Sequence, residues 1–587
     1  MAAERTFVSV LRDNVRAYGN SRGFTFVTEE RGPGHKYREE ELGLADLDRK
    51  ARALAGHLDA LGVRRGAVLL LYPAGLDFIS AFVGCLYGQV IAVPAPFPEL
   101  DAGRAERTHR IIRDADIQWI LTDSSHREKV EEWLAESGLD GEVRCLATDV
   151  DVKADPDGWT MPRYDPDEPA FLQYTSGSTS DPKGVEVTYG NLLRNAEEIN
   201  ARIEGGAHTV GIGWVPHYHD MGLVGQILHP LYMGGRYVLM SPITFIKRPV
   251  VWLEMVTRHR ATIIVGPNFG YELLLRRVTD AQLAELDLSS LLIVKNGAEP
   301  VLAGTLDRMV ERFGPAGFRR EMWMPCYGMA ETTLLISAAP LGQGPVVRVF
   351  DFESLTRNRA VPRRSATEDG TRRLVSSGRP VTLDVRVVDP ATRTELPDGR
   401  VGEIWVSGGS VARGYWRRPR QTKATFQAVT AAGGPTYLRT GDLGFIADGE
   451  LYVTGRIKDL IIVNGHNIYA HDLEEVSRSA HPATRTAAAF SLDALGGSGQ
   501  ERVIIVQEVI PAAARDMGLA ELASFTRDMV ARAFGLPSLS VVLSGPGAVR
   551  RTTSGKIQRG LTRQAFLDGK IKQLAGDLEP SVAGLGG

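Results

Sequence analysis

The strongest constraint on the fold is an alternation of helical and extended segments in the first part of the chain. Apolar residues at helical spacing between Leu47 and Leu61 end at Gly62, and the apolar run Ala67–Leu71 that follows predicts a buried strand. The same alternation recurs as helix 104–114 with strand 117–121, helix 250–258 with strand 262–265, and strand 291–294 with helix 301–313. This pattern predicts α/β subdomains built on largely parallel sheets.

The pattern changes near Thr382. Short extended runs at 383–388 and 402–407, separated by turn residues, predict a small antiparallel β subdomain. Strands at 460–463 and 502–509 and helices from 471 and near 519–534 then predict a small α+β domain. We therefore expect an N-terminal domain at 1–455 with a β-rich subdomain at 382–455, a hinge at 456–459 and a mobile C-terminal domain at 460–587.

Composition narrows the class of protein. A chain of 587 residues is too long for one core, and a net charge of -3 gives no reason to expect a nucleic-acid partner. The three cysteines have no paired spacing, which argues against a disulfide framework or a zinc site and favours a reducing cytoplasm. The apolar stretch 78–98 is interrupted by glycines and prolines, so we expect a buried helix, a short strand and a turn there and no transmembrane segment.

The loop Tyr174–Gly184 reads Y-T-S-G-S-T-S-D-P-K-G. Glycines let backbone N–H groups turn toward an anion, while hydroxyls and one lysine add donors and charge, so the loop is suited to phosphate. The residues expected to contribute are Thr175, Ser176, Gly177, Ser178, Thr179 and Lys183. Since the loop lies between the apolar run 170–172 and a helical stretch at 189–203, we expect a strand to pass directly into a helix there. The alternative is a solvated Ser/Gly turn.

Further motifs follow in a fixed order. They are W-V-P-H-Y-H-D-M-G-L at 214–223, N-G-A-E-P at 296–300, Y-G-M-A-E-T at 327–332, Y-L-R-T-G-D-L-G at 437–444, G-R-I-K-D at 455–459 and T-S-G-K-I-Q-R at 553–559. Together they resemble the adenylate-forming enzymes, which include acyl-CoA synthetases, adenylation domains of peptide synthetases and luciferases. The resemblance covers residues 170–559.

Within that superfamily the chain looks most like a fatty acyl-AMP ligase. The features that carry this are V-P-A-P-F-P at 93–98, H-D-M-G-L at 219–223, K-D-L-I-I-V-N-G-H-N-I-Y at 458–469 and a long link between Glu331 and Gly378. Fatty acyl-AMP ligases carry an insertion in that link, which is thought to restrain the C-terminal domain and to disfavour coenzyme A. The resemblance places Arg357–Arg373 in the insertion, with a plain solvated loop as the alternative.

The resemblance also implies catalytic roles. Lys556 would be the central positive group at the α-phosphate, Glu331 would hold Mg²⁺, and His219 would be a gate beside the acyl site. Lys458 falls at the superfamily's hinge, although an ordinary linker lysine is an equal alternative. His217 lies two residues before His219, and a metal site from His217, His219 and Asp220 is a minor alternative.

The implied nucleotide site uses residues from several motifs. Besides the phosphate loop it comprises Gly297, Ala298, Glu299, Tyr327, Gly328, Met329, Ala330 and Thr332, with Asp442 as the ribose ligand and Arg456 as a further donor. The acyl site is expected within the stretches 225–237 and 266–271.

The implied reaction is activation of a fatty acid by ATP, with Mg²⁺, to an acyl-adenylate and pyrophosphate. The acyl group would then pass to the phosphopantetheine thiol of an acyl carrier protein, with coenzyme A disfavoured. The alternatives are an acyl-CoA ligase and a non-catalytic nucleotide-binding protein of the same fold. A P-loop phosphotransferase is poorly supported, because neither Gly555-Lys556 nor Gly569-Lys570 has the upstream glycine of that loop.

Overall fold

The structure is a computed structural model that describes residues 5–30, 36–98, 102–175, 182–365, 370–492, 501–552, 555–580 and 582, with only the backbone at 102–104. The chain forms two compact units. Unit 1 comprises Met1–Val346, Val375–Val385 and Trp405–Arg439, and unit 2 comprises Val347–Leu374, Arg386–Ile404 and Thr440–Gly587. The domain scheme with a hinge at 456–459 stays a prediction.

A nine-stranded sheet forms one half of unit 1. Its order is β17 (Arg379–Pro380), β14 (Leu335–Ala338), β13 (Trp323–Gly328), β12 (Ile293–Asn296), β11 (Ile263–Gly266), β9 (Val210–Gly213), β10 (Arg236–Met240), β1 (Gly23–Glu29) and β2 (Tyr37–Gly43). The six strands from β13 through β1 are parallel to one another, whereas β2, β14 and β17 pair antiparallel at the two ends of the sheet. The parallel centre places the carboxyl ends of β11, β12 and β13 at one edge.

A seven-stranded sheet forms the other half of unit 1. Its order is β20 (Gly414–Tyr415), β8 (Lys183–Thr188), β7 (Pro169–Thr175), β4 (Ile91–Pro94), β3 (Ala67–Leu70), β5 (Trp119–Thr122) and β6 (Arg144–Ala147). The strands from β7 to β6 are parallel, while β8 and β20 are antiparallel additions. Both sheets therefore confirm the prediction of largely parallel α/β subdomains.

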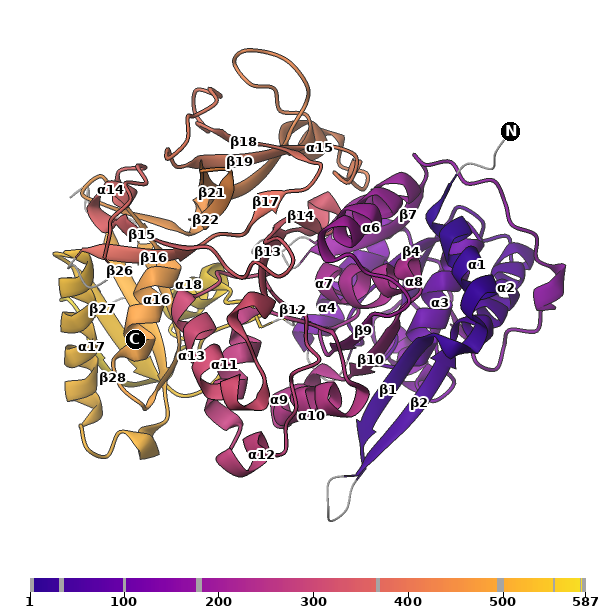
Figure 1. Cartoon of the computed structure of the whole chain (residues 1–587), viewed down its shortest axis with the longest axis horizontal. Coiled ribbons are helices and arrows are strands. Elements are labelled where there is room, and N and C mark those ends of the chain that lie inside the picture. The colour runs from indigo at the N-terminus through magenta and orange to yellow at the C-terminus, as the bar shows by residue number, and fades with distance from the viewer. Residues whose placement is uncertain are drawn as a thin grey trace. The chain divides into compact units, whose positions relative to one another are not determined.

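Helices cover both sheets of unit 1. They are α1 (Phe7–Tyr18), α2 (Leu44–Ala60), α3 (Leu76–Tyr87), α4 (Ala102–Ala115), α5 (Arg127–Glu136), α6 (Tyr189–Ile203), α7 (Asp220–Leu223), the π-helical turn η3 (Val224–Leu228), α8 (His229–Met233), α9 (Pro242–Lys247), α10 (Val250–His259), α11 (Asn268–Arg277), α12 (Asp280–Ala284), α13 (Ala303–Phe313) and α15 (Pro419–Phe426). Figure 1 shows α1, α2 and α3 beside one another. The apolar stripe predicted from Leu47 to Leu61 is buried in the main core cluster with α3 and α6 as far as Leu58, whereas Leu61 caps the end of α2 and is exposed.

Unit 2 contains a four-stranded sheet covered by helices. The sheet runs β25 (Thr484–Leu492), β26 (Arg502–Val509), β27 (Leu539–Ser544) and β28 (Gln573–Asp577), and α16 (Ala470–Ser479), α17 (Leu519–Phe534) and α18 (Arg559–Leu567) pack on it (Figure 1). Two hairpins precede it: β15 (Val347–Asp351) with β16 (Thr371–Val375), separated by α14 (Phe352–Thr356), and β23 (Leu460–Val463) with β24 (His466–Tyr469). The predicted small α+β segment is confirmed.

A separate four-stranded sheet corresponds to the predicted β-rich region. Its order is β18 (Asp384–Val388), β19 (Gly402–Ser407), β21 (Leu438–Ala447) and β22 (Glu450–Arg456). The strands β21 and β22 form an antiparallel hairpin in which Asp442 lies opposite Arg456.

One sequence prediction about the phosphate loop is wrong. The strand β7 does not pass directly into a helix, because β8 lies between the loop and α6 and pairs antiparallel with β7, with Thr175 opposite Lys183. The loop therefore joins two strands of a hairpin. The helix α6 begins only after Thr188, whose hydroxyl accepts a hydrogen bond from the Asn191 N–H as an N-cap.

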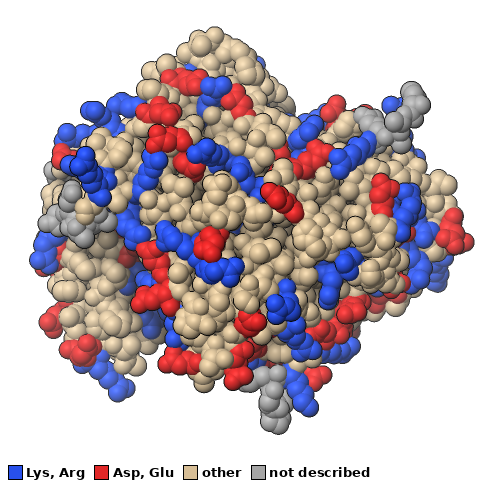
Figure 2. Space-filling model, viewed as in Figure 1, with Lys and Arg blue, Asp and Glu red and all other residues tan. Residues whose placement is uncertain are grey.

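The exposed charges do not form a field of one sign on the face seen in Figure 2, where basic and acidic residues are interspersed. Across the described part of the chain, no helix combines the length and the apolar character needed to cross a bilayer.

Candidate functional site

The two motifs predicted to hold the base follow neighbouring parallel strands. N-G-A-E-P follows β12 and Y-G-M-A-E-T follows β13, and the two strands pair with Asn296 opposite Pro325. A Cβ on Gly297 would lie 2.6 Å from the Cys326 carbonyl oxygen, and one on Gly328 would lie 1.7 Å from that of Leu334. Glycine is therefore required at both positions, because the backbones approach so closely.

Two other members of the predicted adenine slot are fixed by local structure. Ala298 has a φ of +67°, in the left-handed region that non-glycine residues rarely occupy. The Glu299 carboxylate accepts a hydrogen bond of 2.6 Å from the Phe269 N–H near the start of α11. Glu299 thus anchors the adjoining helix, a structural role that the motif alone did not indicate.

Tyr415 connects the two charged residues that the sequence assigned to phosphate and metal. Its hydroxyl donates to Glu331 Oε1 over 3.0 Å, and the Lys183 ammonium lies 5.2 Å from the centroid of its ring. Glu331 is 8 % exposed and lies in a short 3-10 turn, Ala330–Thr332, directly after β13. The ring thus brings a carboxylate and an ammonium from distant parts of the sequence to the same residue.

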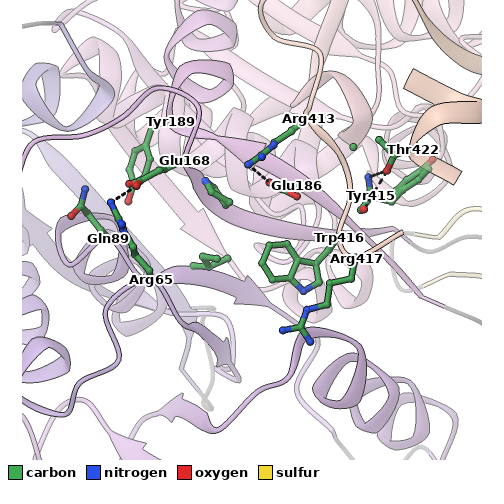
Figure 3. Close-up of a pocket in the computed structure, with 13 residues that line it drawn as sticks. Arg65, Gln89, Glu168, Glu186, Tyr189, Arg413, Tyr415, Trp416, Arg417 and Thr422 are labelled. Atoms are coloured by element: carbon green, nitrogen blue, oxygen red, sulfur yellow. Dashed lines mark hydrogen bonds and ion pairs between the residues drawn. The ribbon is translucent and has the colours of Figure 1, made fainter. Parts of the chain in front are cut away.

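The backbone of Tyr415 is held on both sides. Thr422 Oγ1 accepts from the Tyr415 N–H (3.0 Å) and donates to its carbonyl (3.3 Å), and β20 pairs with β8. Beside this strand Arg413 forms an ion pair of 3.0 Å with Glu186 (Figure 3). A cavity of about 540 Å³ lies along this edge, and the residues that line it include Tyr415 but none of the site residues predicted from the sequence.

Only some of the other residues predicted to bind phosphate lie in the described part of the chain. Ser176, Gly177, Ser178 and Thr179 lie outside the described residues. Thr175 ends β7, and its carbonyl accepts from Arg107 Nη2 over 3.0 Å. Thr332 is fully buried, and its hydroxyl donates to the Met329 carbonyl over 3.0 Å, so here it serves the turn that carries Glu331.

The two histidines of the H-Y-H-D segment lie in different environments. His217 is buried against the Phe78 ring at 4.1 Å, and burial lowers its pKa to about 3, so it is a neutral core residue. His219 is the residue before α7 and is only partly buried. Gln173 of β7 donates to the Tyr218 carbonyl over 2.8 Å, which ties this segment to the strand before the phosphate loop.

The minor metal-site alternative is not formed. Across the residues that the structure describes, no group of three His, Cys, Asp or Glu side chains is arranged to hold a metal ion, and His217, His219 and Asp220 are all described. A hard cation bound by one carboxylate together with substrate phosphates needs no such group.

Unit 2 brings together the predicted ribose and hinge residues. Asp442 is 4 % exposed, and its Oδ1 accepts from Arg456 Nε over 2.9 Å across the β21–β22 hairpin. Lys458 follows in the 3-10 turn Ile457–Asp459, where partial desolvation and the charge of Arg456 lower its pKa. The three predicted residues are therefore neighbours at the end of one hairpin.

Lys556 is exposed and lies in a tight turn. The Thr552 N–H donates to the Lys556 carbonyl over 2.8 Å, and the Lys556 N–H donates to Thr552 Oγ1 over 3.1 Å. The turn holds its backbone, and across the described residues no hydrogen bond or ion pair engages its ammonium.

The same motif ends in Arg559, which the sequence analysis did not single out. Its guanidinium forms two hydrogen bonds to the Glu474 carboxylate, of 2.7 and 2.8 Å, and one of 2.8 Å to Asp459. Arg559 therefore joins the segment that carries Lys556 to the turn that carries Lys458.

Comparisons with known proteins agree with this arrangement. Residues 18–416 match the family model described as AMP-binding enzyme. The chain is 42 % identical over 540 residues to a medium-chain-fatty-acid–[acyl-carrier-protein] ligase of Moorena producens, covering 91 % of each chain. It is 34 % identical to a 4-hydroxyphenylalkanoate adenylyltransferase of Mycobacterium tuberculosis, covering 97 % of this chain and 93 % of the relative.

A solved structure is also similar. It is that of a fatty acyl-adenylate ligase from Legionella pneumophila in complex with acyl adenylate and pyrophosphate, with a TM-score of 0.74, 34 % identity and 98 % of both chains covered. The match to the AMP-binding enzyme model covers more than half of the chain, and the similarity to these relatives extends along nearly all of it. The chain is therefore an AMP-binding enzyme of the adenylate-forming superfamily and belongs to its fatty acyl-AMP ligase group.

Proposed function

We propose that this enzyme activates a fatty acid with ATP to an acyl-adenylate, releases pyrophosphate, and transfers the acyl group to the phosphopantetheine thiol of an acyl carrier protein. The observation that carries this proposal is the arrangement in unit 1. Two nucleotide motifs follow adjacent parallel strands, and Glu331 and Lys183 meet at Tyr415. A relative at 42 % identity named for a carrier-protein acceptor supports the second step.

The first step joins a carboxylate to a triphosphate, and these repel one another. Positive groups must therefore converge before the carboxylate oxygen can attack the α-phosphorus in line. Lys183 serves the phosphates that leave as pyrophosphate, and Lys556 serves the α-phosphate. A Mg²⁺ ion held by Glu331 would neutralise phosphate charge when bound.

The remaining residues position the nucleotide. Asp442 accepts hydrogen bonds from the ribose hydroxyls, while Arg456, which already pairs with it, holds the carboxylate in place. Gly297, Ala298 and Tyr327 hold the adenine at the carboxyl ends of β12 and β13. His219 borders the acyl site, and Lys458 is the hinge at which the backbone changes between adenylation and thiol transfer.

The enzyme works in the cytoplasm on this proposal. Its three cysteines are free thiols, and burial raises the pKa of Cys145 to about 12 and that of Cys326 to about 11, so both are unreactive in a reducing compartment.

An acceptor competition tests the function. The enzyme is incubated with ATP, a ladder of fatty acids, a phosphopantetheinylated carrier protein and coenzyme A, and the products are identified by mass spectrometry. We expect AMP, pyrophosphate and acylated carrier protein. Efficient acyl-CoA formation without carrier loading would select the acyl-CoA ligase alternative, and no pyrophosphate release from well-folded protein would select the non-catalytic one.

Contacts within unit 2 support a restraining role for the predicted insertion. Thr356 Oγ1 lies 2.9 Å from His466 Nδ1, Asn467 donates to Asn358 over 2.9 Å, and Arg372 pairs with Asp472. The rings of Phe352 and Phe534 also meet edge to face at 5.4 Å. Residues just before the insertion and near both of its ends are thus bonded to the segment that follows the hinge, which a solvated loop would not be.

Loosening these contacts is expected to raise acyl-CoA formation at least severalfold, because the C-terminal segment would gain freedom to accept a second thiol. The variant Thr356→Val, Asn358→Ala, Arg372→Met removes one polar partner from each pair, and deletion of 357–373 is the stronger change. Arg363→Met is a matched control, since Arg363 forms an ion pair with Asp351 inside the β15–β16 hairpin. An unchanged ratio of acyl-CoA to acyl-carrier product in both variants would refute the restraint.

Removing the Tyr415 hydroxyl is expected to raise the Mg²⁺ concentration needed for half-maximal adenylation about tenfold or more, because a hydrogen bond to a charged group contributes about 1.5–3 kcal/mol. Tyr415→Phe keeps the ring beside Lys183 and removes the hydroxyl that donates to Glu331. Adenylation is followed across a Mg²⁺ titration, and Mn²⁺·ATP binding is followed by electron paramagnetic resonance. Tyr437→Phe, which removes a hydroxyl bonded to Asp384, is the control. Equal Mg²⁺ dependence in both variants would exclude a positioning role for Tyr415.

A further inference from the structure

A lysine occupies the interior of the nine-stranded sheet. Lys295 is the third residue of β12, and it lies opposite Val265 of β11 and Met324 of β13. Side chains alternate along a strand, so Lys295 points to the same face as Ile293, and both Ile293 and Met324 belong to the main core cluster. Central strands of parallel sheets are normally apolar, so a lysine here is an exception that the fold does not require.

The ammonium of Lys295 has no acidic partner. Among the described residues, no hydrogen bond or ion pair joins it to another side chain, and burial lowers its pKa to about 8. The ionisable side chains that interact with it are the Cys326 thiol on β13 and His229 on α8, and neither is anionic near neutral pH. A desolvated ammonium without an acidic partner is costly, and an oxygen of a bound ligand would offset that cost.

Two polar atoms share this lack of partners, one on His229, which interacts with Lys295, and one on Tyr237 of β10 in the same sheet. Tyr237 Oη and His229 Nε2 are buried, and neither has a hydrogen-bond partner among the described residues. Both residues lie within 225–237, one of the two stretches expected to form the acyl site. A fully apolar alkyl chain would leave these groups unsatisfied.

The same region retains accessible surface. Lys295, Cys326, Gly225 and Leu334 lie on interior elements, yet each is only partly buried. Gly225 lies in the π-helical turn η3, and a Cβ placed on it would be 3.4 Å from Leu334. Turns of this kind are frequent at functional sites. The accessible surface of these four residues is what a bound acyl chain would cover.

We propose that Lys295 determines acyl specificity, selecting acids whose chain carries a second hydrogen-bond-accepting oxygen group, such as a carboxylate, hydroxyl or oxo group, over plain alkyl acids. This inference rests on the proposed function. The ammonium binds the oxygen of the acyl chain at the end of β12. Lys295 lies one residue before the N-G-A-E-P motif, so the acyl chain is recognised next to the nucleotide.

The test compares octanoic acid with eight-carbon acids that carry a hydroxyl or oxo group at the third, fifth or terminal carbon, or a second terminal carboxylate. Pyrophosphate release gives kcat/KM for each acid in the wild-type enzyme and in Lys295→Met, which keeps the length of the side chain. We expect the wild type to prefer at least one oxygenated acid about ten- to hundredfold over octanoic acid. Lys295→Met should lose that preference while octanoic acid is used at least as well.

Lys247→Met, at an exposed position of unit 1, is the matched control and should keep the preference. Preference of the wild type for octanoic acid over every oxygenated acid would overturn the inference. An equal loss of kcat/KM for all acids in Lys295→Met would also overturn it, because the lysine would then be structural.

The pH profile gives a readout that a structural lysine would not change. The preference for the dicarboxylic acid should fall as pH rises through about 8, where the ammonium loses its proton, and should be independent of pH in Lys295→Met. The facing groups do not titrate there. Burial raises the pKa of Cys326 to about 11, raises those of Tyr237 and Tyr271, and lowers that of His229 well below its usual value.

Calorimetric binding of the same acids separates this inference from the proposed function. If no acid releases pyrophosphate, the proposed function fails. Tighter binding of an oxygenated acid by the wild type than by Lys295→Met would still support the inference, and equal binding of all acids would refute it.

Discussion

Replacement of Lys556 by alanine is expected to lower the rate of acyl-adenylate formation about a thousandfold while the fold stays intact. A unit charge at about 4 Å from the reacting phosphate is worth roughly 4 kcal/mol at an effective dielectric of 20, and that energy corresponds to about three orders of magnitude in rate. The fold should tolerate the change because the Lys556 side chain is exposed and its turn is held by backbone groups and the Thr552 hydroxyl.

The measurement is single-turnover formation of acyl-AMP, with circular dichroism as the check on folding. Lys570→Ala is the matched control, since Lys570 is an exposed lysine of the same unit paired with Asp568 at 2.9 Å, and it should have full activity. Acyl transfer from synthetic acyl-adenylate to the carrier protein should survive in Lys556→Ala, because the charge is needed only in the first step. Near-normal acyl-AMP formation by this variant would refute the assignment.

The elements that the sequence predicted well are those with long or continuous apolar patterns. The helices α6 and α17 and the strands β19, β23 and β26 have the expected bounds, because periodicity and flanking turn residues define them locally. The strand β8, K-G-V-E-V-T, was missed beside the phosphate loop. Its alternation of apolar and polar residues is short, because a single glutamate stands between its two valines. Pairing with β7 makes this segment a strand.

The sequence predicted the site as a list of motifs, but it could not predict the contacts between those motifs. Glu331 and Tyr415 lie far apart in the sequence, and no spacing rule connects them, although their side chains meet at 3.0 Å. The G-Y-W-R-R-P segment has a Gly and an aromatic residue before a helix start, which is a weak signal. Lys295 was missed for a related reason: a lysine in I-V-K-N is indistinguishable from a solvated one until the neighbouring strands are known.

Loss of the Arg559 guanidinium is expected to destabilise unit 2 by about 3–5 kcal/mol, the usual cost of leaving one partner of a buried ion pair uncompensated. Glu474 is 2 % exposed, and two of its described hydrogen bonds come from Arg559, with a third from the Ala489 N–H. Arg559→Met keeps the apolar stem of the side chain, so the change isolates the charge. A stable variant would show that the network does not hold the unit together.

The measurement must report on unit 2 itself. All eight tryptophans of the chain lie in unit 1, so intrinsic fluorescence would follow the wrong unit, and hydrogen exchange by mass spectrometry on α16 and α18 is the appropriate probe. Arg527→Met is the control, because its pairs with Asp528 and Asp577 are partly exposed and should contribute less than about 1 kcal/mol.

A double-mutant cycle completes the argument. If the cost comes from an uncompensated carboxylate, Arg559→Met with Glu474→Gln should be more stable than Arg559→Met alone, because the neutral amide carries no buried charge. The third contact of Arg559, to Asp459, is still missing in the double variant, so its effect on catalysis can be measured apart from the effect on stability. The double variant would regain exchange protection in α16 while its adenylation stays reduced, because the turn carrying Lys458 is no longer tied to the segment carrying Lys556. Full recovery of both properties would mean that Arg559 acts on stability alone.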